Sequence, residues 1–496
     1  MKTLVGGVAL ALLVGCATSP QATMPRRPNV VVFLVDDLGW QDSSEPFHRE
    51  RTPWNDRYRT PNLERLCRAG TKFTQAYAHP VCTPSRASLL TGMAAATHRA
   101  THWTLRQDTP TDPQRHGLLR PEWNLHGLSS EATTPRAFHA PTLPQRLRTV
   151  GYRSILVGKA HFGAIGTPGA DPRQLGFDEN VAGHAAGAPS SYLAKNGFLR
   201  NDKDTVWKVP GLERHHGSDR FLTDVLTDEA IAAAARARAD GAPFFLYLAH
   251  YAVHTPLDAD ARFVQRYLDA GLPEAEARYA ALVEGMDHSL GRLLDWLEAQ
   301  GIADDTLVVF ASDNGGLSAN SRGGEPHRHN SPLRSGKGSL YEGGLRIPFV
   351  ASWPGHVPAN ATSPQPVQLE DLLPTVCGLL GLDAGAVDGT SLAAAWTGGP
   401  AAPHPLFFHH PHYWGSQGPG IEPGSAVRDG DWKLVWFYRD ARAELYDLAH
   451  DLGETQDLAA ARPEVTARLR ALLRAHLQAK NAQVPSRADG TPCALP

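Results

Sequence analysis

The sequence predicts an α/β protein with a large, mixed and mostly parallel central sheet flanked by helices, followed by a smaller C-terminal α+β subdomain. Four apolar runs predict the sheet, because each has the length of a strand and lacks the polar alternation of a strand that faces water. They occupy residues 29–35, 154–157, 244–249 and 306–311, and helical stretches alternate with them. A change to shorter strands after about residue 400 predicts the subdomain.

Two long helices are expected between the runs. Residues 222–239 are rich in alanine, with acidic residues early and arginine late, and residues 273–300 carry leucine, methionine and tryptophan at helical spacing. The elements expected in the subdomain are a hairpin over 426–437 that turns at Asp429-Gly430, a strand over 444–448 and a helix over 464–480.

The chain is expected to divide into four parts. A stretch rich in Gly, Pro and Ala at residues 397–404 separates a catalytic α/β domain over 28–399 from the subdomain over 400–496. Before them, residues 1–16 have the pattern of a lipoprotein signal peptide, and residues 17–27 form a polar tether.

The N-terminal segment predicts a lipid anchor. Its apolar run, residues 4–14, is too short to span a bilayer, and residues 13–16 resemble the bacterial lipobox. The resemblance implies that Cys16 is acylated and becomes the first mature residue, and Ala17 resembles outer-membrane sorting. We therefore expect a protein of the bacterial cell envelope, anchored to the outer membrane. The alternative is a plain secretory signal with an incidental cysteine.

Charge and composition exclude several classes of protein. Lys and Arg number 48 against 51 Asp and Glu, so the net charge is −3 and no basic footprint for nucleic acid is present. With 42% hydrophobic and 20% charged residues the chain is neither disordered, coiled coil nor collagen. Its five cysteines are too few and too scattered for a disulfide framework or a C-x-x-C metal site.

Each of the four apolar runs ends on polar residues that can carry chemistry. In open α/β sheets, ligands bind beyond the carboxyl ends of the strands, so these endings predict one shared site. The endings are Asp36-Asp37, Lys159 with His161, His250 with His254, and Asp313-Asn314. Of the third pair, His250 is nearer the buried strand and is the weaker candidate.

Four of these residues form an all-oxygen set. Carboxylate and amide oxygens suit a hard cation such as Ca²⁺ or Mg²⁺ and not Zn²⁺. We predict that Asp36, Asp37, Asp313 and Asn314 bind one such ion. Taken separately, each acidic pair would suit a solvated turn or a helix cap.

Cys82 is expected to open a helix. Pro84 and Ser85 suit a first helical turn, and apolar residues follow them. A helix N-terminus with Arg86 one turn on favours an anion or an activated nucleophile. The alternative is a small buried cysteine near a helix cap.

Residues 82–92 resemble the signature of the type I sulfatases, C-x-P-S-R-x-x-x-L-T-G, at every fixed position. Further resemblances follow in order along the chain, at residues 29–39, 158–163, 306–315, 336–348, 426–435 and 444–458. The resemblance implies an alkaline-phosphatase-like fold and an enzyme that hydrolyses sulfate esters.

The resemblance also implies roles for the site residues. Cys82 is converted to Cα-formylglycine by a formylglycine-generating or anaerobic sulfatase-maturating enzyme, and the hydrate attacks sulfur and joins the metal ligands. Calcium is favoured over magnesium. Among the remaining residues, Arg86 orients the formylglycine, Lys159 and Lys337 hold the sulfate, His161 assists elimination, and His254 with Lys337 protonates the leaving oxygen.

A sulfated carbohydrate is the expected substrate. The loop over residues 323–330 lies between the metal segment and Lys337, so Glu325, His327 and His329 are predicted at the pocket rim, unless this is simply a polar surface loop. Trp103, Trp123 or Trp207 would suit a sugar ring. Residues 165–189 and 325–330 resemble bacterial carbohydrate sulfatases, including those for 4-O-sulfated galactose or N-acetylgalactosamine. His98 is predicted either to contact substrate or to support the site.

Two other readings of the sequence remain open at this stage. A phosphodiesterase or phosphonate monoester hydrolase of the same fold also carries a C-x-P-x-R nucleophile, and a preference for phosphate over sulfate esters would favour it. A lipoprotein that only binds sulfated glycans would leave Cys82 unmodified, so Cys82→Ala would keep binding and the unmutated protein would never release sulfate.

The lipid anchor can be tested directly. Cys16→Ser removes the acylated thiol, so it should move the protein from the membrane fraction to the soluble fraction while its activity persists. Immunoblots of the two fractions measure the change. Unchanged membrane fractionation of the variant would refute the anchor.

Overall fold

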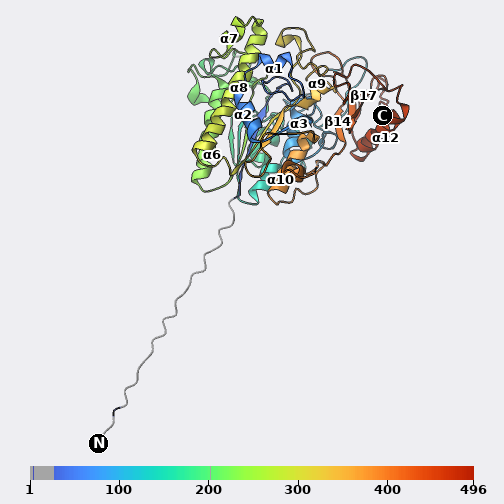
Figure 1. Cartoon of the computed structure of the whole chain (residues 1–496). Coiled ribbons are helices and arrows are strands. Elements are labelled where there is room, and N and C mark those ends of the chain that lie inside the picture. Colours follow the sequence, from blue (N-terminus) through green and yellow to red (C-terminus); the bar gives the residue numbers. More distant parts are fainter. Residues whose placement is uncertain (1–3, 5–26, 202, 401) are drawn as a thin grey trace.

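A computed structural model describes residues 4, 27–201, 203–400 and 402–496, and the lipid-anchor prediction at Cys16 lies outside them. The main body is built on an eight-stranded sheet with the order β12-β2-β11-β9-β1-β8-β6-β7 (Figure 1). Its strands are β1 (Asn29–Val35), β2 (Thr71–Phe73), β6 (Arg153–Gly158), β7 (Glu179–Val181), β8 (Phe244–Ala249), β9 (Thr306–Ser312), β11 (Phe349–Ser352) and β12 (Ala361–Ser363).

The strands that carry the predicted site are parallel neighbours. β1 lies between β9 and β8, and β6 pairs with β8 on its other side, all in parallel register. β11 runs antiparallel to both β9 and β2, which makes the sheet mixed. The carboxyl ends of β1, β6, β8 and β9 therefore share one edge, as the sequence predicts.

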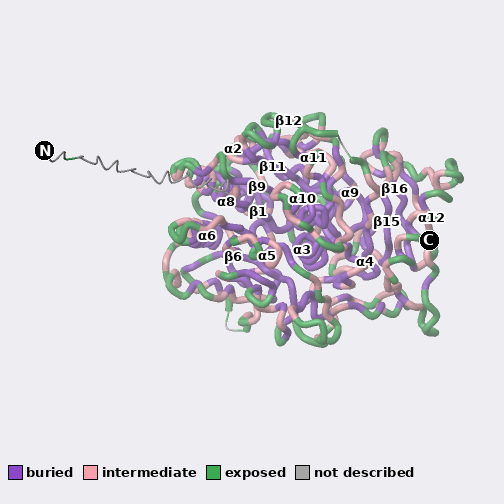
Figure 2. Tube along the Cα trace, turned by 90° about the horizontal axis from the view of Figure 1, so that it is seen from below, coloured by how far each residue is buried: buried purple, intermediate pink, exposed green. Residues whose placement is uncertain are grey.

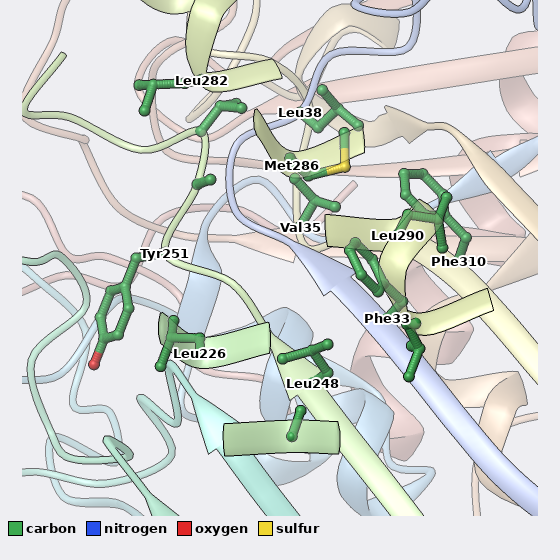
Figure 3. Close-up of a cluster of buried hydrophobic side chains, with 14 of the residues drawn as sticks. Phe33, Val35, Leu38, Leu226, Leu248, Tyr251, Leu282, Met286, Leu290 and Phe310 are labelled. Carbon is green, nitrogen blue, oxygen red and sulfur yellow. The ribbon is translucent and has the colours of Figure 1, made fainter. Parts of the chain in front are cut away.

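Helices cover both faces of this sheet. In β1, Val31, Phe33 and Val35 face one layer and the alternate residues face the other. The first layer contains α2 (Pro61–Ala69), α6 (Leu222–Ala239) and α8 (Glu274–Ala299), and Figure 3 shows Met286 and Leu290 of α8 near Phe33 and Phe310. The second layer contains α3 (Cys82–Thr91), α5 (Leu143–Arg148) and α10 (Leu372–Leu379). Buried segments occupy the interior of the molecule, and exposed segments lie mostly at its periphery (Figure 2).

A second sheet occupies the C-terminal part. It is antiparallel, in the order β14 (Leu406–His410), β15 (Gly424–Asp429), β16 (Trp432–Phe437) and β17 (Arg442–Asp447), and α12 (Pro463–Ala479) packs on it (Figure 1). A buried ion cluster joins it to the main body, because Lys433 Nζ lies 3.0 Å from Glu342 Oε1 and 2.8 Å from Glu454 Oε1.

The predicted fold class is confirmed, and the long elements lie where the sequence predicts them. α6 matches its predicted range at both ends, and α8 is shorter than predicted by one residue at each end. The antiparallel partners β2 and β11 and the edge strand β12 were not predicted. Within the described residues, no helix is both long and apolar enough to cross a membrane.

Candidate active site

Three acidic side chains meet where β1 and β9 end. Asp36 and Asp37 follow β1, Asp313 follows β9, and the two strands are parallel neighbours, so the three residues lie at one edge. The Asp313 amide donates to the Val35 carbonyl (3.1 Å), and the Asp37 amide donates to Asp313 Oδ1 (3.2 Å). All three carboxylates are buried, so their charges interact in a medium of low dielectric constant.

α3 brings Cys82 to these carboxylates. The helix begins at Cys82 as predicted, and Gly92 ends it at φ 69°, in the left-handed conformation that suits glycine. Cys82 Sγ lies 3.7 Å from Asp36 Oδ1, and the ligand atoms of this thiol and the three carboxylates all lie within 4.8 Å of one another. Burial raises the pKa of the Cys82 thiol to about 12, so the unmodified side chain is not a nucleophilic thiolate at neutral pH.

Each carboxylate has its own buried cation. The pairs are Lys159–Asp36 (2.7 Å), Lys337–Asp37 (2.6 Å) and Arg86–Asp313 (2.8 Å). Lys337 Nζ also lies 3.4 Å from Cys82 Sγ. Burial works to raise the pKa of Asp313, but Arg86 and Lys159 outweigh it and lower this pKa below its ordinary value. Burial likewise works against the charge of Lys337, but Asp37, Cys82, Asp36 and Asp313 together outweigh it, so the pKa of Lys337 is raised.

The oxygen atoms of this cluster fit a hard divalent cation. Burial raises the pKa of Asp36 to about 8 despite the contact with Lys159, and Asp313 and Asp37 raise it further, so the paired cations do not fully compensate the negative charge. Asn314 Oδ1 is buried and has no hydrogen-bond partner among the described residues, while Nδ2 donates to Asp37 Oδ1 (2.8 Å). An unpaired amide oxygen beside three carboxylates matches an all-oxygen metal site.

His254 lies in the segment that follows β8. Its backbone carbonyl accepts a hydrogen bond from Tyr192 Oη (2.8 Å), which fixes the loop. The ring Nδ1 lies 2.7 Å from the Thr255 carbonyl, which can only accept, and Nε2 lies 3.7 Å from Asp37 Oδ2. Burial, with Lys337 as the next contribution, lowers the pKa of His254 to about 4, so the ring is neutral at pH 7 with its proton on Nδ1.

His161 follows β6 and has a free ring nitrogen. It adopts φ 56°, and its Nε2 lies 2.9 Å from the Thr104 carbonyl, which accepts the ring proton. Nδ1 is buried and has no hydrogen-bond partner within the described part of the chain. Burial, then Lys159, lowers the pKa of His161 well below its ordinary value. Gly187 packs so closely that a Cβ there would lie 2.2 Å from His161 Cε1, so only glycine fits.

A pocket of about 250 Å³ opens above these groups. Cys82, His161, His254 and Lys337 line its inner end. The indoles of Trp103, Trp207 and Trp414 form much of the remaining wall. The sequence suggested the first two tryptophans, but Trp414 was missed, because it lies beyond β14 in the C-terminal part and no motif marks it.

Several predicted residues lie outside the lining of this pocket. His98 and His329 are buried in hydrogen bonds of their own: His98 Nε2 is 3.0 Å from Ser88 Oγ, and His329 Nε2 is 2.8 Å from the Gly323 carbonyl. Burial lowers the pKa of His98 to about 3. The predicted residues Asp36, Asp37, Arg86, Lys159, Asp313 and Asn314 are buried and are also absent from the lining. Four more candidates lie elsewhere: Glu325 is exposed beside Arg328 at 3.3 Å, His327 packs against Gly418, Trp123 is buried against His412, and His250 is buried 2.8 Å from Ser289 Oγ.

Comparison with known proteins assigns the chain to a family. The family model described as Sulfatase matches residues 28–382, and one described as N-sulphoglucosamine sulphohydrolase, C-terminal, matches residues 336–483. The chain is 29% identical over 508 residues to a Sulfatase of Formosa agariphila, covering 88% of this chain and 85% of that protein. It is 32% identical over 407 residues to the N-acetylgalactosamine-6-sulfatase of Mus musculus, covering 78% and 70%.

A solved structure agrees with this assignment. The crystal structure of Ps i-CgsB in complex with k-i-k-neocarrahexaose superposes with a TM-score of 0.72 at 27% identity, covering 91% of this chain and 93% of that chain. The chain therefore belongs to the sulfatase family and is a sulfuric ester hydrolase. Members of this family generally use a formylglycine and a divalent cation.

The oxygen cluster predicts that a divalent cation stabilises the folded protein. Adding Ca²⁺ or Mg²⁺ should raise the midpoint of thermal unfolding, by a free energy of about 2.7 kcal/mol at a hundred times the Kd. Asp313→Asn keeps an oxygen that can accept from Arg86 but removes one charged metal ligand. This variant should therefore lose most of the cation-dependent rise in the unfolding midpoint. Asp431→Asn, at an exposed acid in the turn between β15 and β16, should keep this gain in stability. Equal midpoints with and without cation in the wild type would contradict the metal site.

Proposed function

We propose that this sulfatase hydrolyses the sulfate ester of a sulfated sugar, on a galactose or N-acetylgalactosamine unit. The observation that carries the proposal is the pocket at Cys82, whose lining combines the ammonium group of Lys337 with the indoles of Trp103 and Trp207. Fixed cations suit a sulfate group, and aromatic faces suit the apolar faces of a sugar ring. The mouse relative and the complex with k-i-k-neocarrahexaose support a carbohydrate substrate.

Two positions of the sulfate are favoured by different observations. The resemblance of residues 165–189 and 325–330 to bacterial carbohydrate sulfatases predicts the 4-O position. The mouse relative is named for the 6-sulfate, which favours the 6-O position. We retain 4-O as the sequence-based prediction and test it against 6-O on the same sugar.

The proposed nucleophile is Cα-formylglycine at Cys82. The modification would supply a nucleophile that the unmodified side chain does not, because burial raises the pKa of the Cys82 thiol to about 12 and keeps it protonated at neutral pH. As its hydrate, formylglycine would supply one hydroxyl for attack on sulfur and a second for release of sulfate, and a bound Ca²⁺ would offset charge on the sulfate oxygens. The residues proposed to hold Ca²⁺, in preference to Mg²⁺, are Asp36, Asp37, Asp313 and Asn314 with the modified Cys82.

The remaining residues divide into positioning and proton-transfer roles. Arg86, held by Asp313, orients the nucleophile. We assign the sulfate to the ammonium groups of Lys337, which lines the pocket, and of Lys159, which is buried against Asp36. Lys337 keeps its proton at neutral pH, and we propose that it protonates the leaving oxygen. The neutral His254 donates its Nδ1 proton to the Thr255 carbonyl, so its predicted share in this step requires that Nε2 first takes up a proton. His161 is neutral, and its unpartnered Nδ1 can accept a proton when sulfate is eliminated.

The proposal also assigns a location and two partners. The lipobox at Cys16 supports an outer-membrane lipoprotein of a bacterial cell envelope. The sulfatase signature at residues 82–92 supports recognition by a formylglycine-generating or anaerobic sulfatase-maturating enzyme. The remaining partner is the sulfated carbohydrate itself.

Sulfate release from defined sugars tests this function. Protein from a host with maturation activity should release sulfate faster from 4-O-sulfated than from 6-O-sulfated N-acetylgalactosamine, and Cys82→Ala should lose roughly three orders of magnitude or more of this rate. Ion chromatography measures the sulfate. The phosphate ester of the same sugar is the matched control for a phosphohydrolase.

The possible outcomes separate the alternatives. Faster release of phosphate than of sulfate would overturn the sulfatase mechanism proposed for Cys82. Binding of the sulfated sugar without any sulfate release, retained in Cys82→Ala, would favour a binding protein instead.

A further inference from the structure

Among the described residues, the wall of the pocket away from Cys82 carries no charged side chain. Among the described residues that line the pocket, the ionisable side chains are Cys82, His161, His254 and Lys337, and all four lie at the reacting centre. The rest of the lining consists of small, polar uncharged and aromatic residues. A wall of this kind discriminates between substrates by shape and apolar contact. Its aromatic rings are therefore the candidates for substrate specificity.

Trp414 differs from the other two wall tryptophans because it contacts the catalytic machinery. Lys337 Nζ lies 5.7 Å from the centroid of its indole, and the same ammonium lies 3.4 Å from Cys82 Sγ. The indole also packs on the backbone of Gly338, where φ is 87° and a Cβ would lie 2.5 Å from Trp414 Cε3. The ring therefore lies beside Lys337, the cation proposed to face the leaving oxygen.

The chain on both sides of Trp414 holds the ring in place. The two residues before it are buried, and His412 lies 3.0 Å from Asp112 Oδ2 and 2.8 Å from Thr101 Oγ1. After it, Arg115 donates to the Gly415 carbonyl (2.9 Å). Trp414 itself is half-buried, so part of the ring is open to the pocket. A fixed aromatic surface of this kind binds a ring at little entropic cost.

We propose that Trp414 is a specificity-determining residue whose indole stacks on the sugar ring that carries the scissile sulfate. This inference rests on the proposed carbohydrate substrate. The C-terminal part of the chain thereby supplies the substrate platform, while the main body supplies the nucleophile, the metal ligands and the sulfate-binding cations. Binding of the sulfate group alone does not require the indole.

Kinetics of Trp414→Ala and Trp414→Phe test the proposal. On the sulfated N-acetylgalactosamine that the wild type hydrolyses, Trp414→Ala should lower kcat/KM roughly tenfold or more, mainly through a higher KM, because a stacking contact and its buried area are lost. Trp414→Phe keeps an aromatic face and should recover most of the loss. Trp432→Ala is the matched control, since Trp432 is half-buried on β16 and does not line the pocket.

Inhibition by inorganic sulfate separates stacking from a structural role. Sulfate occupies the cation cluster and has no ring, so its Ki should be the same in Trp414→Ala and the wild type. A Ki that rises together with KM would show that Trp414 acts by positioning Lys337, which would overturn the proposal. Unchanged KM for the sugar would overturn it while the carbohydrate function stands. If the wild type hydrolyses no sulfated sugar, both proposals fail.

Discussion

The buried pairing of three carboxylates with three cations is the constraint on which the rest of the structure depends. Asp36, Asp37 and Asp313 lie in the interior, and each ion pair holds its geometry without the screening of water. Removing one partner of such a pair costs about 3–5 kcal/mol, because the other charge is left buried and uncompensated. The strand ends, α3 and the loops that carry Lys159 and Lys337 must therefore all reach one point.

The fold satisfies this constraint with elements from distant parts of the sequence. Parallel pairing of β1 with β9 and β8 brings three strand ends to one edge, and α3 enters from the second helical layer. The lysine segment needs separate support. Glu342, five residues after Lys337, is paired with Lys433 of the C-terminal sheet, and both are buried. The C-terminal part thus holds the Lys337 loop and carries Trp414 into the pocket.

The sequence predicts those features that depend on local pattern. Strands buried on both faces leave continuous apolar runs, and the cysteine motif with its helix start is local, so β1, β8, α6 and the start of α3 were predictable. The short antiparallel strands leave no such run. Their existence depends on pairing with distant segments, which no local pattern records.

Side-chain placement was less predictable for the same reason. A histidine in a polar loop and a histidine buried in hydrogen bonds look alike in sequence, and His98 and His329 lie outside the pocket lining with partners of their own. Trp414 enters the pocket through a long-range contact with Gly338, which only the structure reveals. Residue type therefore indicated the chemistry of the site, and tertiary packing determined which residues reach it.

The central claim is that this cluster is built around a modified Cys82 and not a free thiol. The most direct measurement is the mass of the tryptic peptide of residues 73–86, prepared from protein expressed in a host with sulfatase maturation activity. We predict the mass of the aldehyde-containing peptide, with a matching shift when the aldehyde is trapped by a hydrazide. An unmodified cysteine in active protein from that host would contradict the account.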